Sequence, residues 1–218
     1  MSETYGIPRP SLRRLPIYYR HLIEMAERQV PYVSSKDLGQ NAGVPASQVR
    51  KDLSYLHEYG RPGVGYDTKA LAGYLEEFLG LANDKEAILV GVGNLGRALT
   101  LYPGFAQYGL QIIALFDIDP AKIGQTVGDR EVLPMFKLVD LARRLKVQMG
   151  IITVPPHAAQ EVASAMVSGG IKVIWNFAPC KLTVPAEVLV KSEDLAAELA
   201  ALSHHIMRRS QVLAPATE

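Results

Sequence analysis

A glycine-rich segment constrains the fold of this chain more than any other feature. The segment, Gly91-Val92-Gly93-Asn94-Leu95-Gly96, follows the apolar run at residues 87–90 and opens a stretch with helical periodicity. The next apolar run ends at Asp117, 21 positions beyond Gly96. A strand, a glycine turn, a helix and a later acidic residue in this order form the dinucleotide-binding fingerprint. We therefore predict a βαβ unit that binds a dinucleotide.

Each fingerprint residue has a distinct physical role. Gly91 permits the tight turn, Gly93 lets the backbone approach a pyrophosphate, and Gly96 lets the helix pack closely on the strand. The first backbone N–H groups of that helix are free to bind phosphate oxygens. Asp117 would accept hydrogen bonds from the adenine ribose, and its charge would repel a 2′-phosphate. NAD(H) is therefore favoured over NADP(H).

The residues after position 86 alternate between strand and helix patterns. This alternation predicts a parallel, doubly wound, Rossmann-like sheet, which binds ligands at the carboxyl ends of its strands. The expected strands are 88–90, 112–116, 131–133, 149–154 and 171–175, and the expected helices are 94–101, 136–146 and 158–168. With the fingerprint residues, the expected cofactor contacts at this edge are Ile118, Asp119, Thr153, Val154, Pro155, Asn176, Phe177 and Ala178.

The same domain has little that would support catalysis. His157 is a candidate base, but two prolines precede it, and they favour a rigid wall with an exposed histidine at a helix start. We find no Tyr-x-x-x-Lys pair, no metal-ligand cluster and no second domain for another substrate. The sequence therefore predicts that the cofactor is bound without turnover, that no residue is catalytic and that no metal is held.

Composition predicts a cytoplasmic protein. No apolar run approaches the roughly 20 residues that cross a membrane, and the N-terminus has no apolar stretch typical of a secretory signal. Cys180 is the only cysteine, which excludes an intramolecular disulfide and fits a reducing compartment. The net charge of +1 does not by itself indicate nucleic-acid binding.

The first eighty residues nevertheless resemble a helix-turn-helix. A first helix is expected to begin at Pro16, and a second begins with the cap sequence Ser34-Ser35-Lys36-Asp37 and ends at Gly43. A third helix is expected over residues 46–58. Its residues Val49, Leu53 and Leu56 share one face. The opposite face carries Ser47, Arg50, Lys51, Ser54 and Glu58.

Such a third helix suits the major groove of DNA, since its cations can bind guanine or phosphate and its serines permit close approach. The alternative is a solvated helix of a small bundle. A glycine-rich loop at residues 59–66 then resembles a β-wing, with Arg61 at its tip to enter a minor groove, although a plain linker hairpin would look similar. Upstream, Arg9, Arg13, Arg14 and Arg20 have no acid among them and form either a DNA-facing or a solvated arm.

The C-terminal segment carries an apolar stripe. Leu195, Leu199, Leu202 and Ile206 repeat at helical spacing after Ser192, a candidate N-cap. This helix follows the last expected strand. It packs either on its own domain or on a partner subunit, and two DNA-reading domains need dimer symmetry to bind a palindrome.

Taken together, these motifs resemble those of the Rex family of redox-sensing transcriptional repressors. The resemblance runs from about Pro8 to Ile206. Its most specific pieces are Gln48-Val49-Arg50-Lys51-Asp52-Leu53-Ser54-Tyr55, Gly63-Val64-Gly65-Tyr66, Gly93-Asn94-Leu95-Gly96, Tyr102-Pro103-Gly104-Phe105, Phe116-Asp117 with Asp119-Pro120, and Asn176-Phe177-Ala178-Pro179.

The resemblance implies a homodimer that binds a palindromic double-stranded operator and is released by NADH, while NAD+ favours the bound state. It implies a winged helix-turn-helix domain at 1–82, a Rossmann NAD(H)-binding domain at 83–191 and an exchanged C-terminal helix within 192–218. By position, Arg20, Tyr102 and Asp194 would be switch contacts. The residues expected to contact DNA are Arg13, Ser47, Gln48, Arg50, Lys51, Ser54, Tyr55 and Arg61.

Two other functions fit parts of the sequence. One is a small NAD-dependent dehydrogenase with an accessory helical domain, which sustained NADH oxidation with a small carbonyl compound would reveal. The other is a scaffold that binds CoA or a nucleotide and shares only the sheet.

Overall fold

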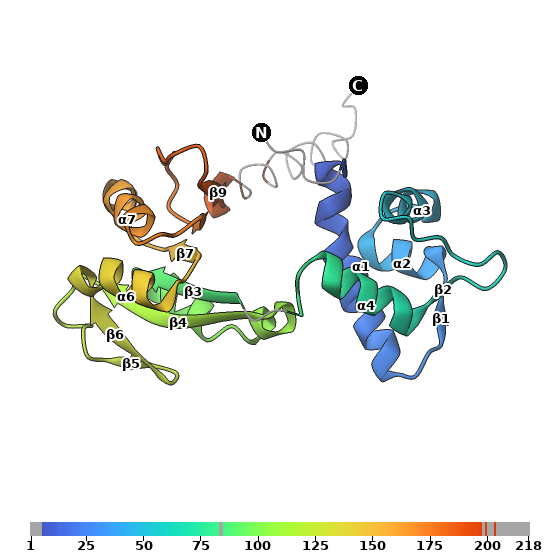
Figure 1. The fold of residues 1–218 in the computed structure, drawn as a ribbon, viewed down its shortest axis with the longest axis horizontal. Helices are drawn as coiled ribbons and strands as arrows, with labels where there is room; N and C mark the ends of the chain where they lie inside the picture. The colour runs from blue at the N-terminus through green and yellow to red at the C-terminus, as the bar shows by residue number, and fades with distance from the viewer. Residues whose placement is uncertain (1–5, 83–84, 198, 200–202, 204–218) are drawn as a thin grey trace, which may run out of the picture. The chain divides into compact units, whose positions relative to one another are not determined.

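The computed structural model describes residues 6–82, 85–197, 199 and 203 of the 218-residue chain. The chain divides into two compact units, residues 1–83 and 84–218. Figure 1 shows the helices of the first unit and the sheet of the second. In the part of the chain that is described, no helix is both long and apolar enough to cross a membrane.

The first unit is a small helical domain with a two-stranded ribbon. Strands β1 and β2 are antiparallel, with Tyr32 opposite Asp67 and Val33 opposite Tyr66. The core contains fully buried side chains from α1 to α4, among them Tyr18, Leu22, Leu38 and Leu75. Its elements are α1 (Arg9–Glu27), β1 (Tyr32–Val33), α2 (Ser35–Ala42), α3 (Ala46–Ser54), β2 (Tyr66–Asp67) and α4 (Thr68–Phe78).

The predicted caps of the second helix of the helix-turn-helix are confirmed, but two of the predicted helix boundaries are wrong. Ser34 and Asp37 form the expected capping box of α2, and Gly43 ends that helix in the left-handed conformation. Helix α1 begins at Arg9, so Pro16 lies inside it. Burial of Leu15 and Tyr18 on either side of Pro16 offsets the backbone hydrogen bond that a proline removes. Helix α3 ends at Ser54, not at residue 58.

In the described residues of the second unit, seven strands form one sheet in the order β5-β6-β4-β3-β7-β8-β9. All neighbouring strands are parallel except β5, which pairs antiparallel with β6 at one edge. Without β5 this is the doubly wound strand order, and its switch point lies between β3 and β7. The strands are β3 (Lys85–Val90), β4 (Leu110–Asp117), β5 (Thr126–Val127), β6 (Arg130–Pro134), β7 (Met149–Ile152), β8 (Val173–Asn176) and β9 (Leu189–Ser192).

Two apolar clusters cover the faces of this sheet. Residues of α6 (Leu138–Leu145) and α7 (Pro156–Ser168) pack on the face that includes Ile88 and Val90. Figure 1 draws both helices on one side of the strands. The other face, with Leu89, packs near α5 (Asn94–Thr100) and the 3-10 helix η1 (Pro103–Tyr108), and a second 3-10 helix, η2 (Met135–Lys137), precedes α6.

Strand β9 was not expected from the sequence, and its presence corrects the assignment of Ser192. Its residues are mostly exposed at the sheet edge, so they lack the apolar pattern of a central strand. Ser192 pairs with Asn176 in the sheet and is therefore not a helix cap. Asp194 caps the following helical turn, because its Oδ1 accepts hydrogen bonds from the N–H groups of Ala196 and Ala197, each at 3.0 Å. Leu202 and Ile206 lie outside the described residues.

Candidate functional site

The glycine turn after β3 has the shape that the fingerprint predicts. Gly91 has φ +99°, and a Cβ atom there would lie 2.8 Å from the carbonyl carbon of Thr153. A Cβ atom on Gly96 would overlap the carbonyl oxygen of Gly91. A Cβ atom on Gly93 would meet nothing within 4 Å, so the backbone at this exposed position is open to an approaching group.

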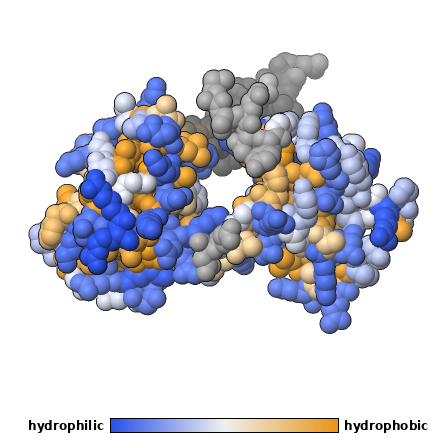
Figure 2. Space-filling view, viewed as in Figure 1, coloured by the Kyte–Doolittle hydropathy of each residue, from blue (hydrophilic) through white to orange (hydrophobic). Residues whose placement is uncertain are grey.

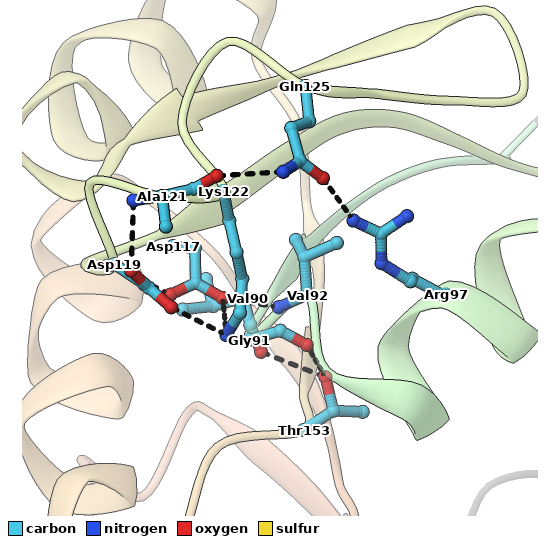
Figure 3. A network of polar contacts seen from close by, with 10 residues as sticks. All are labelled: Val90, Gly91, Val92, Arg97, Asp117, Asp119, Ala121, Lys122, Gln125 and Thr153. Atoms are coloured by element: carbon cyan, nitrogen blue, oxygen red, sulfur yellow. Dashed lines mark hydrogen bonds and ion pairs between the residues drawn. The ribbon is translucent and has the colours of Figure 1, made fainter.

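Thr153 fastens this turn to the neighbouring strand. Its hydroxyl lies 2.7 Å from the carbonyl oxygen of Gly91 and 3.0 Å from that of Val90, and donates to them (Figure 3). The side chain therefore holds β3 and β7 together at the switch point.

Asp117 is a nearly buried carboxylate at the end of β4. Its Oδ2 accepts hydrogen bonds from the N–H of Val92 at 2.8 Å and from Nζ of Lys122 at 3.1 Å. Its Oδ1 accepts a hydrogen bond from the N–H of Asp119 at 2.9 Å. Burial alone would raise the pKa of Asp117, but these three donors lower it below its usual value. The carboxylate is therefore ionised and fixed beside the glycine turn.

A cavity of about 980 Å³ opens at the carboxyl ends of β3, β4 and β7. This volume lies near the upper end of the range for small-molecule sites, roughly 300–1,000 Å³. Its rim carries two exposed apolar side chains, Ile118 at 76% and Phe136 at 81% exposure. Figure 2 shows hydrophobic residues among hydrophilic ones at the surface of this unit. Of the expected cofactor residues, those that line the cavity are Gly91, Gly93, Asp117, Ile118, Asp119, Thr153, Val154 and Pro155.

Among the lining residues that the sequence did not single out are Lys122, Met135 and Phe136. Lys122 follows Asp117 by only five positions, so the sequence did contain a signal for it: a cation close to the acid that was expected to bind the ribose. Phe136 and Met135 lie in η2, which comes from the far side of the β5–β6 hairpin. Only the parallel pairing of β4 with β6 brings η2 to the end of β4.

Asn176, in contrast, does not line the cavity, and its side chain makes hydrogen bonds within the protein. It is fully buried, and its amide nitrogen lies 3.0 Å from the carbonyl oxygen of Ala178, 3.1 Å from that of Cys180 and 3.3 Å from Oγ of Ser192. Its Oδ1 accepts a hydrogen bond from the N–H of Ala178. The amide thus fastens the loop after β8 to β9.

Phe177 belongs to an aromatic row on the α5 side of the sheet. Its ring lies 4.9 Å from that of Trp175, which lies 5.7 Å from Phe105, and Phe105 makes an edge contact with Tyr102. Phe177 is therefore separate from the cavity beside α7. The expected cofactor residues that do not line the cavity are Val92, Asn94, Leu95, Gly96, Asn176, Phe177 and Ala178.

In the first unit, the two faces expected of α3 are confirmed over residues 46–54, whereas Leu56 and Glu58 lie beyond the end of the helix. Val49, Leu53 and Leu56 are buried, whereas Arg50 and Lys51 are exposed. Nη1 of Arg50 donates a hydrogen bond to Oγ of Ser35 at 3.0 Å, which connects the start of α2 to α3. Of the other DNA candidates, Ser47, Arg13 and Arg61 are exposed, and Gln48, Ser54 and Tyr55 are half-buried.

A buried carboxylate organises the inner side of α3. Asp52 has no exposed surface, and the guanidinium of Arg14 donates to both of its oxygens, at 2.6 and 2.7 Å. Its other donors are the Tyr18 hydroxyl at 2.7 Å and the Gln48 amide at 2.8 Å. Arg14 is therefore an internal ion-pair partner and not part of a solvated arm. The sequence offered no signal for this pair, whose members are 38 positions apart.

The Asp52 network predicts a loss of stability in acid. Burial opposes ionisation, but the hydrogen bonds from Arg14, Tyr18 and Gln48 outweigh it and lower the pKa of Asp52 from 3.8 to about 2. Because the pKa is lower in the folded state, the carboxylate stabilises the fold above about pH 4, and this contribution is lost as the pH falls toward 2. A shift of this size corresponds to about 2 kcal/mol. Urea unfolding of the wild type and of Asp52→Asn should therefore differ more at pH 5 than at pH 2, and a constant difference would contradict the prediction.

The structure of the wing at residues 59–66 corrects the prediction that Arg61 lies at its tip. Arg61 and Gly65 form an isolated antiparallel bridge, so Arg61 lies at the base of the turn and Pro62-Gly63 at its tip. Gly63 has φ +74°, which a proline-glycine turn of this kind requires. The Arg61 side chain is exposed.

The three switch candidates are also exposed: Arg20 on α1, Tyr102 before η1 and Asp194 at the helical cap after β9. Among the described residues, no group of three or more histidine, cysteine or acidic side chains could hold a metal ion.

A helix-turn-helix unit with a wing, joined to a doubly wound sheet with a cavity beside a dinucleotide-type glycine turn, defines a class of protein: a DNA-binding regulator that responds to a nucleotide ligand. Two family models match the chain, one described as "Putative DNA-binding protein N-terminus" over residues 6–54 and one described as "CoA binding domain" over residues 82–180. The whole-length relatives are more specific. The redox-sensing transcriptional repressor Rex of Desulfitobacterium hafniense is 44% identical over 95% of this chain and 99% of its own length. The Rex protein of Chloroflexus aggregans is 41% identical over 97% of this chain and its own full length.

Solved structures of a Rex-family repressor are similar to this chain over most of its length. The crystal structure of RSP in complex with β-NAD+ and operator DNA has a TM-score of 0.87 and 35% identity, and covers 94% of this chain and 95% of that chain. The structure of RSP, a Rex-family repressor, in complex with β-NADH has a TM-score of 0.83 and 34% identity over 94% of this chain and 97% of that one. The chain belongs to the Rex family of redox-sensing transcriptional repressors. Membership in a repressor family favours a sensor over both the dehydrogenase and the CoA scaffold.

Proposed function

We propose that this protein represses transcription by binding operator DNA and that NADH releases it, whereas NAD+ leaves it bound. The observation that carries the proposal is the pairing of the two units: one presents the exposed cations of α3 and the other an ionised, immobilised Asp117 beside an open glycine turn. That DNA and both forms of the dinucleotide occur in complexes of a related repressor supports it.

The residues fit a dinucleotide. The open backbone at Gly93 would accommodate the pyrophosphate, and Asp117 would accept hydrogen bonds from the ribose hydroxyls. Ile118 and Phe136, both exposed at the cavity rim, offer apolar surfaces for a purine ring. The protein itself would bind and orient the cofactor without consuming it.

The unit boundaries belong to the same proposal. We assign DNA binding to residues 1–82, cofactor binding to 83–191 and dimerisation to a helix within 192–218. Leu195 and Leu199 are each 64% exposed, which supports a C-terminal helix that is covered by a second subunit. The Rex repressors that resemble this chain come from bacteria, where operator DNA lies in the cytoplasm, and we place this protein there.

The decisive experiment measures fluorescence anisotropy with a palindromic operator that the protein selects from a random double-stranded library. NADH and NAD+ are added separately at one stated salt concentration. Loss of binding with NADH but not with NAD+ is the expected result. Binding that responds to neither dinucleotide would refute the proposal, and sustained NADH oxidation with a carbonyl compound would favour a dehydrogenase.

Replacing Lys51 by alanine should weaken operator binding without changing NADH binding. Lys51 is an exposed cation on the outer face of α3, and a lost base or phosphate contact costs roughly 1–3 kcal/mol, which is about fivefold to 150-fold in affinity. Anisotropy at fixed salt measures the effect, and Lys69→Ala, which removes an exposed lysine from α4, is the control. Equal operator affinity in wild type and Lys51→Ala would show that α3 does not read DNA through this residue.

A further inference from the structure

Lys122 occupies the position from which a cation can act on the ribose end of the cavity. Its Nζ lies 3.1 Å from Oδ2 of Asp117 and 3.6 Å from Oδ2 of Asp119. All three side chains line the cavity. Figure 3 shows the ammonium group pointing toward both carboxylates. A one-third exposed lysine thus lies between two acids at the place where the fingerprint predicts the ribose hydroxyls.

The loop that carries Lys122 is braced from several sides. The Gln125 amide donates to the carbonyl oxygen of Ala121 at 2.8 Å and accepts a hydrogen bond from Nη2 of Arg97 at 2.7 Å. The N–H of Ala121 donates to Oδ1 of Asp119 at 2.9 Å (Figure 3). The backbone N–H of Lys122 donates to the carbonyl oxygen of Asp119 at 3.0 Å. Lys122 is therefore held at the cavity wall and is not a freely moving surface side chain.

The charges around Asp117 would act on a 2′-phosphate in opposite directions. A 2′-phosphate placed at Asp117 would meet two carboxylates, which repel it, and one ammonium, which attracts it. As long as Asp117 is ionised, the ammonium is paired with it, and the site favours a dinucleotide with a free 2′-hydroxyl. Without the Asp117 charge, the same ammonium would attract the phosphate more strongly, because it would no longer be paired with that carboxylate. Asp117 alone therefore does not set the preference between NADH and NADPH, because the effect of its charge depends on whether Lys122 is paired with it.

We propose that Lys122 is a specificity-determining residue, which acts with Asp117 as an opposed pair to set the preference between NADH and NADPH. The inference rests on the proposed function, since it assumes that the cavity binds a nicotinamide dinucleotide. Lys122 holds Asp117 in place for the ribose hydroxyls and is the only cation among the described cavity residues that could bind a 2′-phosphate.

The test is the ratio of NADPH to NADH affinity, measured by calorimetry on the full-length protein. Asp117→Asn should raise this ratio at least tenfold, and Lys122→Met should lower it severalfold. In the double variant Asp117→Asn/Lys122→Met, most of the gain from Asp117→Asn should disappear. Lys122→Arg, which keeps the charge, should retain a ratio close to that of the wild type and shows whether loss of charge, and not loss of packing, is responsible.

Each outcome has one meaning. If Asp117→Asn changes the ratio equally with and without Lys122, the proposal is wrong. If the wild type binds NADH but Lys122→Met and wild type have the same ratio, the proposal also fails, while the sensor function stands. If the wild type binds neither dinucleotide, the proposed function itself has failed. Urea unfolding of each variant, followed by circular dichroism, verifies that the unit that carries Asp117 and Lys122 is folded.

Discussion

Asp52→Ala is expected to destabilise the N-terminal unit by about 3 kcal/mol, the lower end of the cost of breaking a buried ion pair. The reason is that Arg14 and Tyr18 both donate to this fully buried carboxylate, and its removal leaves their polar groups without that acceptor. Because Asp52 lies in α3, operator binding should fall in parallel. Urea unfolding followed by circular dichroism measures the stability.

Glu24→Ala is the matched control for this variant. Glu24 also lies in the first unit, but its carboxylate is half exposed and lies 3.9 Å from His21, so its removal should cost less than about 1 kcal/mol. If Asp52→Ala shifts the unfolding midpoint no more than Glu24→Ala, the buried network does not stabilise the fold. NADH affinity should stay unchanged in both variants, because the cofactor candidates belong to the other unit.

Asp117→Ala is expected to weaken NADH binding about 100-fold. Two hydrogen bonds from ribose hydroxyls to a charged group contribute at least about 1.5 kcal/mol each, and about 3 kcal/mol corresponds to a factor near 100. The substitution also removes the acceptor of the Val92 N–H, so the glycine turn loses a contact that fixes it. Titration calorimetry with NADH measures the effect.

Operator affinity without cofactor should not change in Asp117→Ala. A suitable control is Asp140→Ala, which removes an exposed acid from α6 of the same unit. Equal NADH affinity in wild type and Asp117→Ala would mean that the ribose does not bind at the end of β4, and the cavity would then need another ligand.

The energetic demand on the switch is modest. A ligand shifts two states only through its different affinities for them, and a change from 99% to 1% DNA-competent protein needs roughly 10⁴-fold preference, or about 5.5 kcal/mol. Two cofactor sites in a dimer would share this, at under about 3 kcal/mol each. The oxidised and reduced nicotinamide rings differ in charge and planarity, so the ring end of the site must distinguish them, while Asp117 and Lys122 at the ribose end would bind both forms alike.

Local patterns were enough to predict several features correctly. The capping box of Ser34 and Asp37, the buried and exposed faces of α3, and the glycine turn at Gly91 all depend on residues within a few positions of one another. Their physical basis is the fixed period of a helix and the conformational freedom of glycine, and both can be read from a short stretch of sequence.

Only the tertiary structure decided how distant residues are used. Asp52 reads as a polar residue of an amphipathic helix, yet packing of α1 against α3 brings Arg14 to it across 38 positions. The sequence places Asn176 at the edge of the sheet where ligands bind. In the structure, however, β9 lies beside β8, and the Asn176 amide donates hydrogen bonds to Ser192 of β9 and to the carbonyl oxygen of Ala178. The sequence by itself determined the two kinds of domain and the dinucleotide turn, since those follow from local periodicity and glycine positions. Which polar side chains face the ligand and which hold the fold depended on strand order and helix packing, because a hydrogen-bond partner far along the chain is chosen by the contacts of the folded state.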